Sequence, residues 1–114
     1  MDLNHYKTII QKFVDERNWD QFHTPKNLAM ALSGEVGELT EIFQWLNEEE
    51  SKNLSDKNLQ AAKEELADIF IYLLRISDKL GIDLEDAVNE KIKLNAQKYP
   101  VELAKDNAIK YNQK

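Results

Sequence analysis

The sequence predicts an all-α protein, and three features of its composition and patterning indicate that class. The chain of 114 residues contains only three glycines and two prolines, so few positions interrupt a regular helix. Its many Leu, Glu, Lys, Ala, Ile and Gln residues favour helix over strand. Apolar residues recur at three- and four-residue spacing in the longer segments, which is the period of helices that bury one face.

Length, charge and cysteine content exclude several classes of protein. A mass of 13.3 kDa with 42% hydrophobic residues suits one domain over residues 1–114. The net charge of −6 disfavours binding to a nucleic-acid polymer or an anionic membrane. The absence of cysteine excludes disulfides and thiolate chemistry. Without a leader pattern or a run of about 18 apolar residues, we expect a cytoplasmic location.

The first half of the chain is expected to form two helices. Apolar spacing predicts the first helix over residues 3–17, and residues 18–24 are predicted to be an aromatic-rich connection. Thr24 is a suitable N-cap and Pro25 suits the first helical position. The second helix is therefore expected to run from residue 25 to about residue 45.

The third helix is predicted over residues 56–80, with Gly81 as its stop signal. The preceding acidic stretch, residues 47–55, is expected to be a solvated loop. Residues 66–74 are apolar on nearly every side of the helix, so we expect this helix to be central or shared with another subunit.

A fourth helix is predicted from the N-cap Asp83 to just before Pro100. Lys91, Asn95 and Lys98 recur along it at i, i+4 and i+7 and form a polar, cationic ridge that would suit phosphate oxygens or simply face solvent. Residues 101–114 are polar and are expected to form a mobile tail or to pack over a neighbour.

Two acidic pairs fall where the second and third helices should bury apolar faces. On the second helix, Glu35 projects along the apolar stripe and shares a face with Glu38. On the third helix, Glu65 precedes Asp68 by three residues, and Asp68 lies within the most hydrophobic run of the sequence. Buried carboxylates that repel one another require a compensating cation. Oxygen ligands favour a hard cation, and Mg²⁺ is the usual one with phosphate substrates.

Each acidic pair taken alone equally suits a solvated helix face. Glu41, Glu64 and residues 48–50 lack any support from placement and are interpreted as solvated charges. Only the coincidence of both pairs on apolar sides favours the metal site.

Aromatic residues lie near the predicted acidic cluster. Trp45 is two turns beyond Glu38, and Trp19 comes from the preceding connection, so the two indoles could form a slot for a planar base. They could equally cover the end of the bundle. Tyr72 and His23 could contribute polar groups to the same site, although core packing for the tyrosine and an incidental role for the histidine are the simpler interpretations.

Residues 34–39 (GEVGEL) and 64–69 (EELADI) resemble the signature of the MazG-like all-α nucleoside triphosphate pyrophosphatases. The family pattern is Glu-Glu-x-x-Glu followed by Glu-x-x-Asp, and Gly34 stands in place of the first Glu. The likeness is closer to one branch, the dCTP pyrophosphatases. It is carried by residues 15–23, 43–45, 71–73, 91–95 and 99–100.

The resemblance implies a Mg²⁺-dependent hydrolase that cleaves a nucleoside triphosphate between its α and β phosphates, giving a monophosphate and pyrophosphate. The implied substrate is dCTP or a modified dCTP, and the implied role is clearing unwanted nucleotides. Ile10 stands where that branch carries a substrate-contacting His, so base and sugar preference stay open. A MazG-like four-helix bundle that assembles into a dimer or a dimer of dimers is expected, with sites completed across subunits.

The resemblance also implies roles for individual residues. Glu38 is the first choice for the base that takes a proton from the attacking water, and Lys91 and Lys98 would stabilise the leaving pyrophosphate. The implied metal ligands are Glu35, Glu38, Glu65 and Asp68. The implied nucleotide contacts are Trp19, His23, Trp45 and Tyr72, with Lys91 and Asn95 near the phosphates or sugar.

Two other classes of protein fit these residues less well. A carboxylate-bridged di-iron bundle needs inward Glu-x-x-His pairs, and neither acidic pair is followed by His. A non-catalytic helical oligomerisation module would explain the apolar third helix but gives no reason for Glu35 and Asp68 to lie there.

Overall fold

The computed structural model describes residues 1–106 and 108, and within them every regular element is a helix. This confirms the predicted all-α class. The chain divides into two compact units, one covering Met1–Ile82 and the other beginning at Asp83; each is described by itself. No helix among the described residues is long and apolar enough to cross a membrane.

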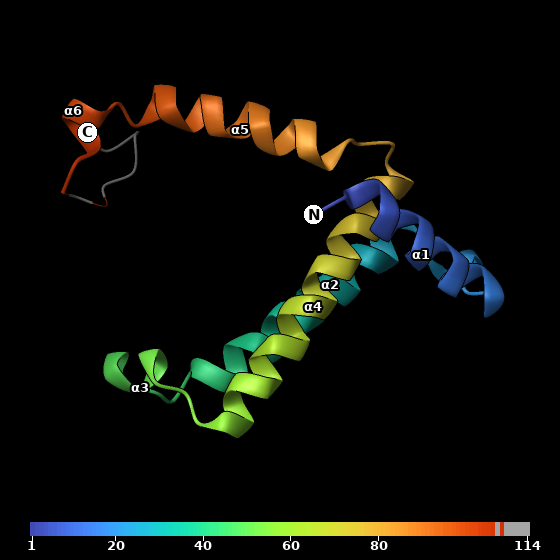
Figure 1. Cartoon of the computed structure of the whole chain (residues 1–114), viewed down its shortest axis with the longest axis horizontal. Helices are drawn as coiled ribbons and strands as arrows, with labels where there is room; N and C mark the ends of the chain where they lie inside the picture. Colours follow the sequence, from blue (N-terminus) through green and yellow to red (C-terminus); the bar gives the residue numbers. More distant parts are fainter. Residues whose placement is uncertain (107, 109–114) are drawn as a thin grey trace. The chain divides into compact units, whose positions relative to one another are not determined.

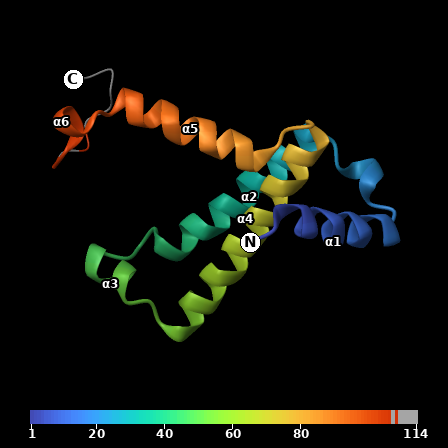
Figure 2. The same cartoon turned by 45° about the horizontal axis from the view of Figure 1, so that its top comes forward.

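Two long antiparallel helices, α2 (Pro25–Phe43) and α4 (Asp56–Lys79), pack side by side as the centre of the first unit (Figures 1 and 2). The Thr24 hydroxyl caps α2 by accepting from a backbone N–H one turn on, and the Ser55 hydroxyl caps α4 in the same way. Gly81 follows α4 with a φ of +68°, a left-handed conformation that glycine adopts without strain. The predicted bounds of both helices are therefore confirmed to within two residues.

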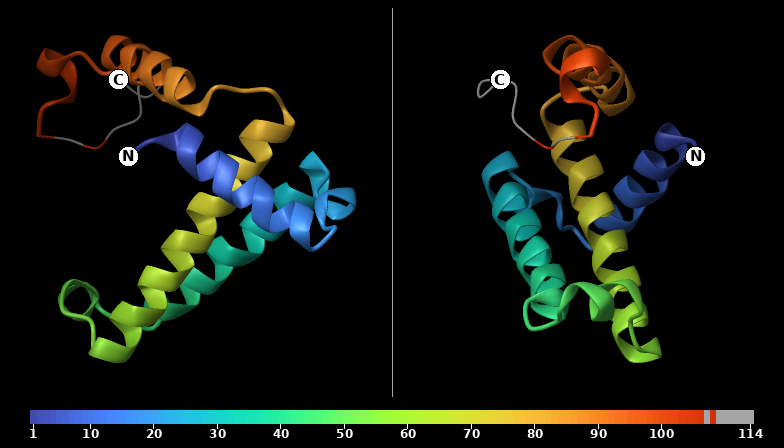
Figure 3. Two further views of the ribbon diagram at one scale, coloured as in Figure 1. Left: turned by 45° about the vertical axis from the view of Figure 1, so that its right-hand side comes forward. Right: turned by 90° about the vertical axis from the view of Figure 1, so that its left-hand side faces the viewer.

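The helix α1 (Leu3–Glu16) packs on α4, so that α4 lies between α1 and α2 (Figure 3). Because α4 is covered by α1 on one side and by α2 on the other, all three helices contribute side chains to the small core. The buried apolar residues of this core are Val14, Leu28, Ala62 and Leu74. The core thus holds the two carboxylate-bearing helices, α2 and α4, in a fixed register.

The stretch predicted to be a solvated loop instead contains a short helix, α3 (Glu48–Lys52). The Asn47 side chain accepts from the Glu50 backbone N–H at 2.8 Å, and the Glu50 carboxylate accepts from the Asn47 backbone N–H at 3.0 Å. This capping box satisfies two otherwise free donors, and three acidic residues in the first turn suit the helix dipole. The loop prediction was wrong for this reason, although the acidic residues are exposed as expected.

Several apolar side chains of α4 lie open to solvent in the single chain. Leu66 is 55% exposed, and Ile71 and Leu73 are each 38% exposed. The prediction that this helix is central is confirmed by its place between α1 and α2. Its sharing with another subunit stays a prediction.

The second unit contains α5 (Leu84–Lys98) and the short α6 (Val101–Ala104). The Asp83 carboxylate caps α5 by accepting from the Asp86 backbone N–H at 3.0 Å, and α5 ends before Pro100, both as predicted. Half of the predicted tail, residues 107 and 109–114, lies outside the described residues. A single domain over residues 1–114, the four-helix bundle and its assembly stay predictions.

Candidate metal centre

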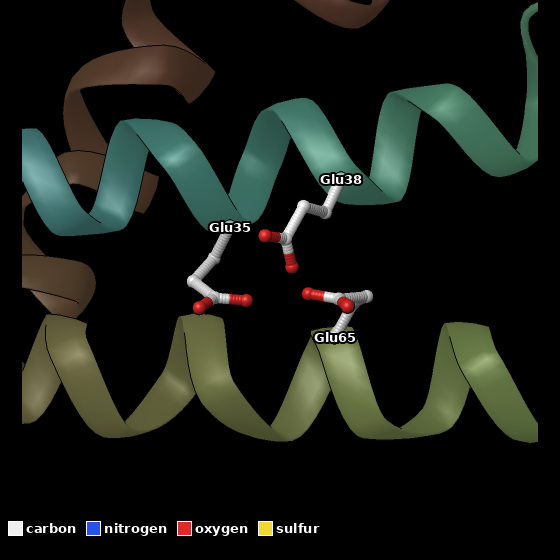
Figure 4. A group of neighbouring side chains, drawn as sticks. All are labelled: Glu35, Glu38 and Glu65. Atoms are coloured by element: carbon white, nitrogen blue, oxygen red, sulfur yellow. The ribbon is translucent and has the colours of Figure 1, made fainter.

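Three carboxylates from two helices meet between α2 and α4. Glu35 and Glu38 lie one turn apart on α2 and point toward α4, while Glu65 points back from α4 (Figure 4). One carboxylate oxygen from each lies within 4.8 Å of the other two. The two predicted acidic pairs therefore do converge, through three of their four members.

The cluster contains buried oxygens that no protein group satisfies. Among the described residues, only Glu35 Oε2 and Glu65 Oε2 are buried side-chain oxygens or nitrogens without a hydrogen-bond partner. An ionised carboxylate can accept hydrogen bonds but cannot donate them. Leaving its oxygens buried without a donor or a cation is costly. A divalent cation with oxygen preference would satisfy both, so the donor set fits Mg²⁺ or a similar hard ion.

Glu65 shows the electrostatic cost of this arrangement. Its pKa is raised from 4.5 to about 7, first because its protonated form can share a hydrogen bond with Glu35, and then because the site is shielded from water. The neighbouring Glu38 adds to the shift through a further hydrogen bond and through its negative charge. Without a cation, the cluster therefore holds a proton at near-neutral pH.

This raised pKa predicts how stability should vary with pH when metal is absent. Between pH 4.5 and about 7 the folded protein keeps a proton on Glu65 that the unfolded chain releases. The contribution of Glu65 is therefore fully present below pH 4.5 and is lost as the pH rises through about 7. Chemical denaturation in the presence of a chelator should show this decline.

The Glu65→Gln variant is the control for that measurement because glutamine keeps the shape of the side chain and does not titrate. The free energy of unfolding of this variant should not show the decrease between pH 4.5 and about 7 that Glu65 causes in the original protein. An identical pH profile in the variant and the original protein would contradict the assignment.

Asp68 does not join the group of three and is exposed, so the expectation that it faces the core was wrong. A step of three residues offsets two side chains by only about 60° around a helix axis, as for Glu35 and the exposed Glu38, and on α4 this offset places Asp68 among the exposed residues. It still acts electrostatically on Tyr72, one turn on. Burial, followed by the charges of Glu35 and Asp68, raises the pKa of Tyr72, so this half-buried tyrosine lies beside the carboxylate cluster.

The two tryptophans are placed differently from each other. Because α2 ends at Phe43, Trp45 lies beyond the helix and is 86% exposed, so it does not continue the α2 face as predicted. Trp19 packs edge-on against Phe13, with ring centroids 5.7 Å apart, and is 44% exposed.

Sequence reasoning missed a polar network built around Arg75 of α4, whose side chain is only 3% exposed. Arg75 Nη1 donates to Gln11 Oε1 at 2.6 Å, and Nη2 donates to Asp20 Oδ1 at 3.1 Å. Hydrogen bonds from Lys79, then Gln11 and Arg75, lower the pKa of Asp20 to about 2. The available signal was a single arginine directly after the apolar run, residues 66–74, of the third predicted helix.

Lys91, Asn95 and Lys98 lie on α5 in the second unit. Lys91 and Asn95 are exposed and Lys98 is half-buried. Their spacing along one helix is as predicted, and their predicted contact with the substrate phosphates stays a prediction.

The chain belongs to the MazG-like family, because the family model matches residues 30–113. That region contains the whole of α4 and residues 30–43 of α2, and so includes Glu35, Glu38 and Glu65.

Curated relatives extend the similarity over nearly the whole chain. The dCTP pyrophosphatase 1 of Mus musculus is 42% identical over 111 residues, which is 96% of this chain and 65% of that protein. The Homo sapiens protein of the same name is 40% identical over 113 residues, covering 97% of this chain and 66% of the relative. The chain thus spans about 65% of the length of these relatives.

A solved structure shows a similar fold. The crystal structure of a pyrophosphatase from Archaeoglobus fulgidus superimposes with a TM-score of 0.81 at 41% sequence identity. The match covers 85% of this chain and 91% of that one.

Proposed function

We propose that this protein is a Mg²⁺-dependent nucleoside triphosphate pyrophosphohydrolase that cleaves between the α and β phosphates. The observation that carries the proposal is the convergence of three carboxylates with two buried, unsatisfied oxygens between α2 and α4. The family membership and the names of the relatives support it. The proposed substrate is dCTP or a modified dCTP, and the proposed role is clearing unwanted nucleotides.

In this proposal the metal ligands are Glu35, Glu38, Glu65 and Asp68. A bound Mg²⁺ would neutralise phosphate charge and lower the pKa of an attacking water. Glu38 is the proposed general base, because among the three clustered carboxylates it is the exposed one and can accept a proton from solvent-accessible water.

We assign the remaining contacts with the nucleotide by the chemical character of each side chain. Trp19 and Trp45 offer exposed indole faces for stacking on a base, and Tyr72 lies next to the carboxylates. Lys91 and Lys98 would stabilise the leaving pyrophosphate. His23 and Asn95 are proposed to hydrogen-bond to the nucleotide.

We also propose that the protein acts in the cytoplasm as a homo-oligomer, either a dimer or a dimer of dimers. The exposed apolar residues of α4 favour association with another copy, because burying them would remove apolar surface from water. In this proposal the substrate site is completed across subunits, because three carboxylates of one chain supply only part of the proposed set of ligands.

The proposal is tested by incubating the protein with a panel of NTPs and dNTPs in Mg²⁺ and resolving the products by chromatography. We expect a monophosphate and pyrophosphate, with dCTP or a modified dCTP consumed fastest. Orthophosphate together with a diphosphate would contradict the cleavage position. No hydrolysis of any member of the panel would favour the alternative of a non-catalytic oligomerisation module.

A further inference from the structure

The Arg75 side chain of α4 presents an N–H donor to one nitrogen of the His23 ring. Arg75 Nε donates to His23 Nδ1 at 3.3 Å. An arginine side chain has only N–H donors and no acceptor, so the ring nitrogen that faces it must present a lone pair. The neutral His23 ring therefore carries its proton on Nε2.

The charged groups around His23 favour this neutral form. Arg75 and Lys79 approach from α4, and Asp20 approaches from the 3₁₀ helix η1 (Asp20–Phe22). Burial, followed by the charge of Arg75, lowers the pKa of His23 below its ordinary 6.5, while Asp20 acts in the opposite direction. The hydrogen-bond geometry and the surrounding charges thus agree.

The same guanidinium also anchors the aromatic segment, residues 18–24, at two points within it. It binds Asp20 through Nη2 and His23 through Nε. At the beginning of the segment, the Trp19 backbone N–H donates to the Val14 carbonyl at 3.0 Å. A residue of α4, the helix that carries Glu65, therefore sets the position of the connection that carries Trp19.

We propose that Arg75 is a positioning residue for nucleotide binding, which orients the aromatic segment and presents His23 as a neutral hydrogen-bond donor through Nε2. This inference rests on the proposed function. A neutral donor of this kind suits a carbonyl oxygen or ring nitrogen of the base, and it supplies no positive charge for the phosphates. Arg75 therefore contributes to selection of the base, while the carboxylate cluster handles the metal.

The tautomer can be tested in the unmodified protein by long-range ¹H–¹⁵N NMR of the histidine rings. The chain has only two histidines, so a His5→Gln variant assigns the His23 signals. We expect Nδ1 to appear as an acceptor and Nε2 as protonated at neutral pH. A proton on Nδ1 would overturn the inference without any dependence on activity.

The Arg75→Lys variant tests the positioning role, because lysine keeps the charge but one ammonium cannot reproduce the three directions of a guanidinium. We expect the His23 ring to lose its single tautomer and KM for the nucleotide to rise about tenfold. Mg²⁺ affinity, measured by calorimetry without nucleotide, should stay unchanged, and kcat should change less than KM. An unchanged KM or an unchanged tautomer would overturn the inference.

The matched control is Arg17→Lys at the only other arginine of the chain. Arg17 is exposed with its guanidinium 3.6 Å from the centre of the Phe13 ring, and a lysine there keeps the charge near the ring. This control should leave KM and the His23 spectrum unchanged. A wild-type protein that hydrolyses no nucleotide would reject the proposed function, and the His23 spectrum would still decide whether Arg75 fixes the ring.

Discussion

Replacing Glu38 with glutamine should reduce nucleotide hydrolysis by about 100- to 1,000-fold, the loss seen when a group that stabilises the transition state is removed. Glutamine keeps the shape of the side chain but removes one negative charge and the proton acceptor. Because the three carboxylates repel one another in the absence of metal, the variant should be at least as stable as the original protein in chelator. Initial rates and thermal melts measure both effects.

The matched control for this variant is Glu41→Gln. Glu41 lies on α2 three residues beyond Glu38, is exposed and stands outside the group of three. The control makes the same change in net charge and should retain the full rate. Equal rates in both variants would remove Glu38 from the mechanism.

Asp68→Asn asks whether a fourth acid belongs to the metal site. If Asp68 is a metal ligand, the Asp68→Asn variant should lose turnover by a similar factor, about 100-fold or more. Glu64→Gln provides an exposed control on the same helix. Full activity of the Asp68 variant would limit the ligand set to the three clustered glutamates.

Mg²⁺ should raise the thermal stability of the protein substantially. A ligand that binds only the folded state at about 100 times its Kd adds about 2.7 kcal/mol. For a domain of this size, about 1 kcal/mol corresponds to a shift of about 4 to 8 °C in Tm, so an increase on the order of 10 °C is expected. The physical source is the satisfaction of the buried oxygens of Glu35 and Glu65.

Scanning calorimetry over a Mg²⁺ titration at fixed pH and ionic strength measures this increase, with Na⁺ at matched ionic strength as the control for screening. In the Glu35→Gln variant the increase should be much smaller, because a buried ligand has been removed. A Tm that does not respond to Mg²⁺ would contradict the metal site, whatever the protein does with nucleotides.

Much of the fold could be predicted because local signals agreed with the final structure. Thr24, Ser55 and Asp83 cap helices as their sequence positions indicate, and Gly81 ends the third long helix through its positive φ. The exception was α3, whose capping box depends on a reciprocal pair, Asn47 and Glu50, inside a stretch that otherwise resembles a charged loop.

The candidate site was predictable to the extent that it follows from helix periodicity. Glu35, Glu38 and Glu65 converge because each side chain points toward the other helix of the α2–α4 pair, whereas Asp68 is exposed and does not join them. The role of Arg75 could not be read in the same way. Its partners, Gln11, Asp20 and His23, come from distant parts of the sequence, and only the tertiary fold brings them together.

The solvent-facing leucines and isoleucine of α4 have a practical consequence for every melting experiment. If the proposed homo-oligomer buries the exposed Leu66, Ile71 and Leu73 side chains of α4, that burial adds stability, and mass action links the gain to protein concentration. Dilution should consequently act as a mild denaturant, lowering the transition temperature even though no solvent component has changed.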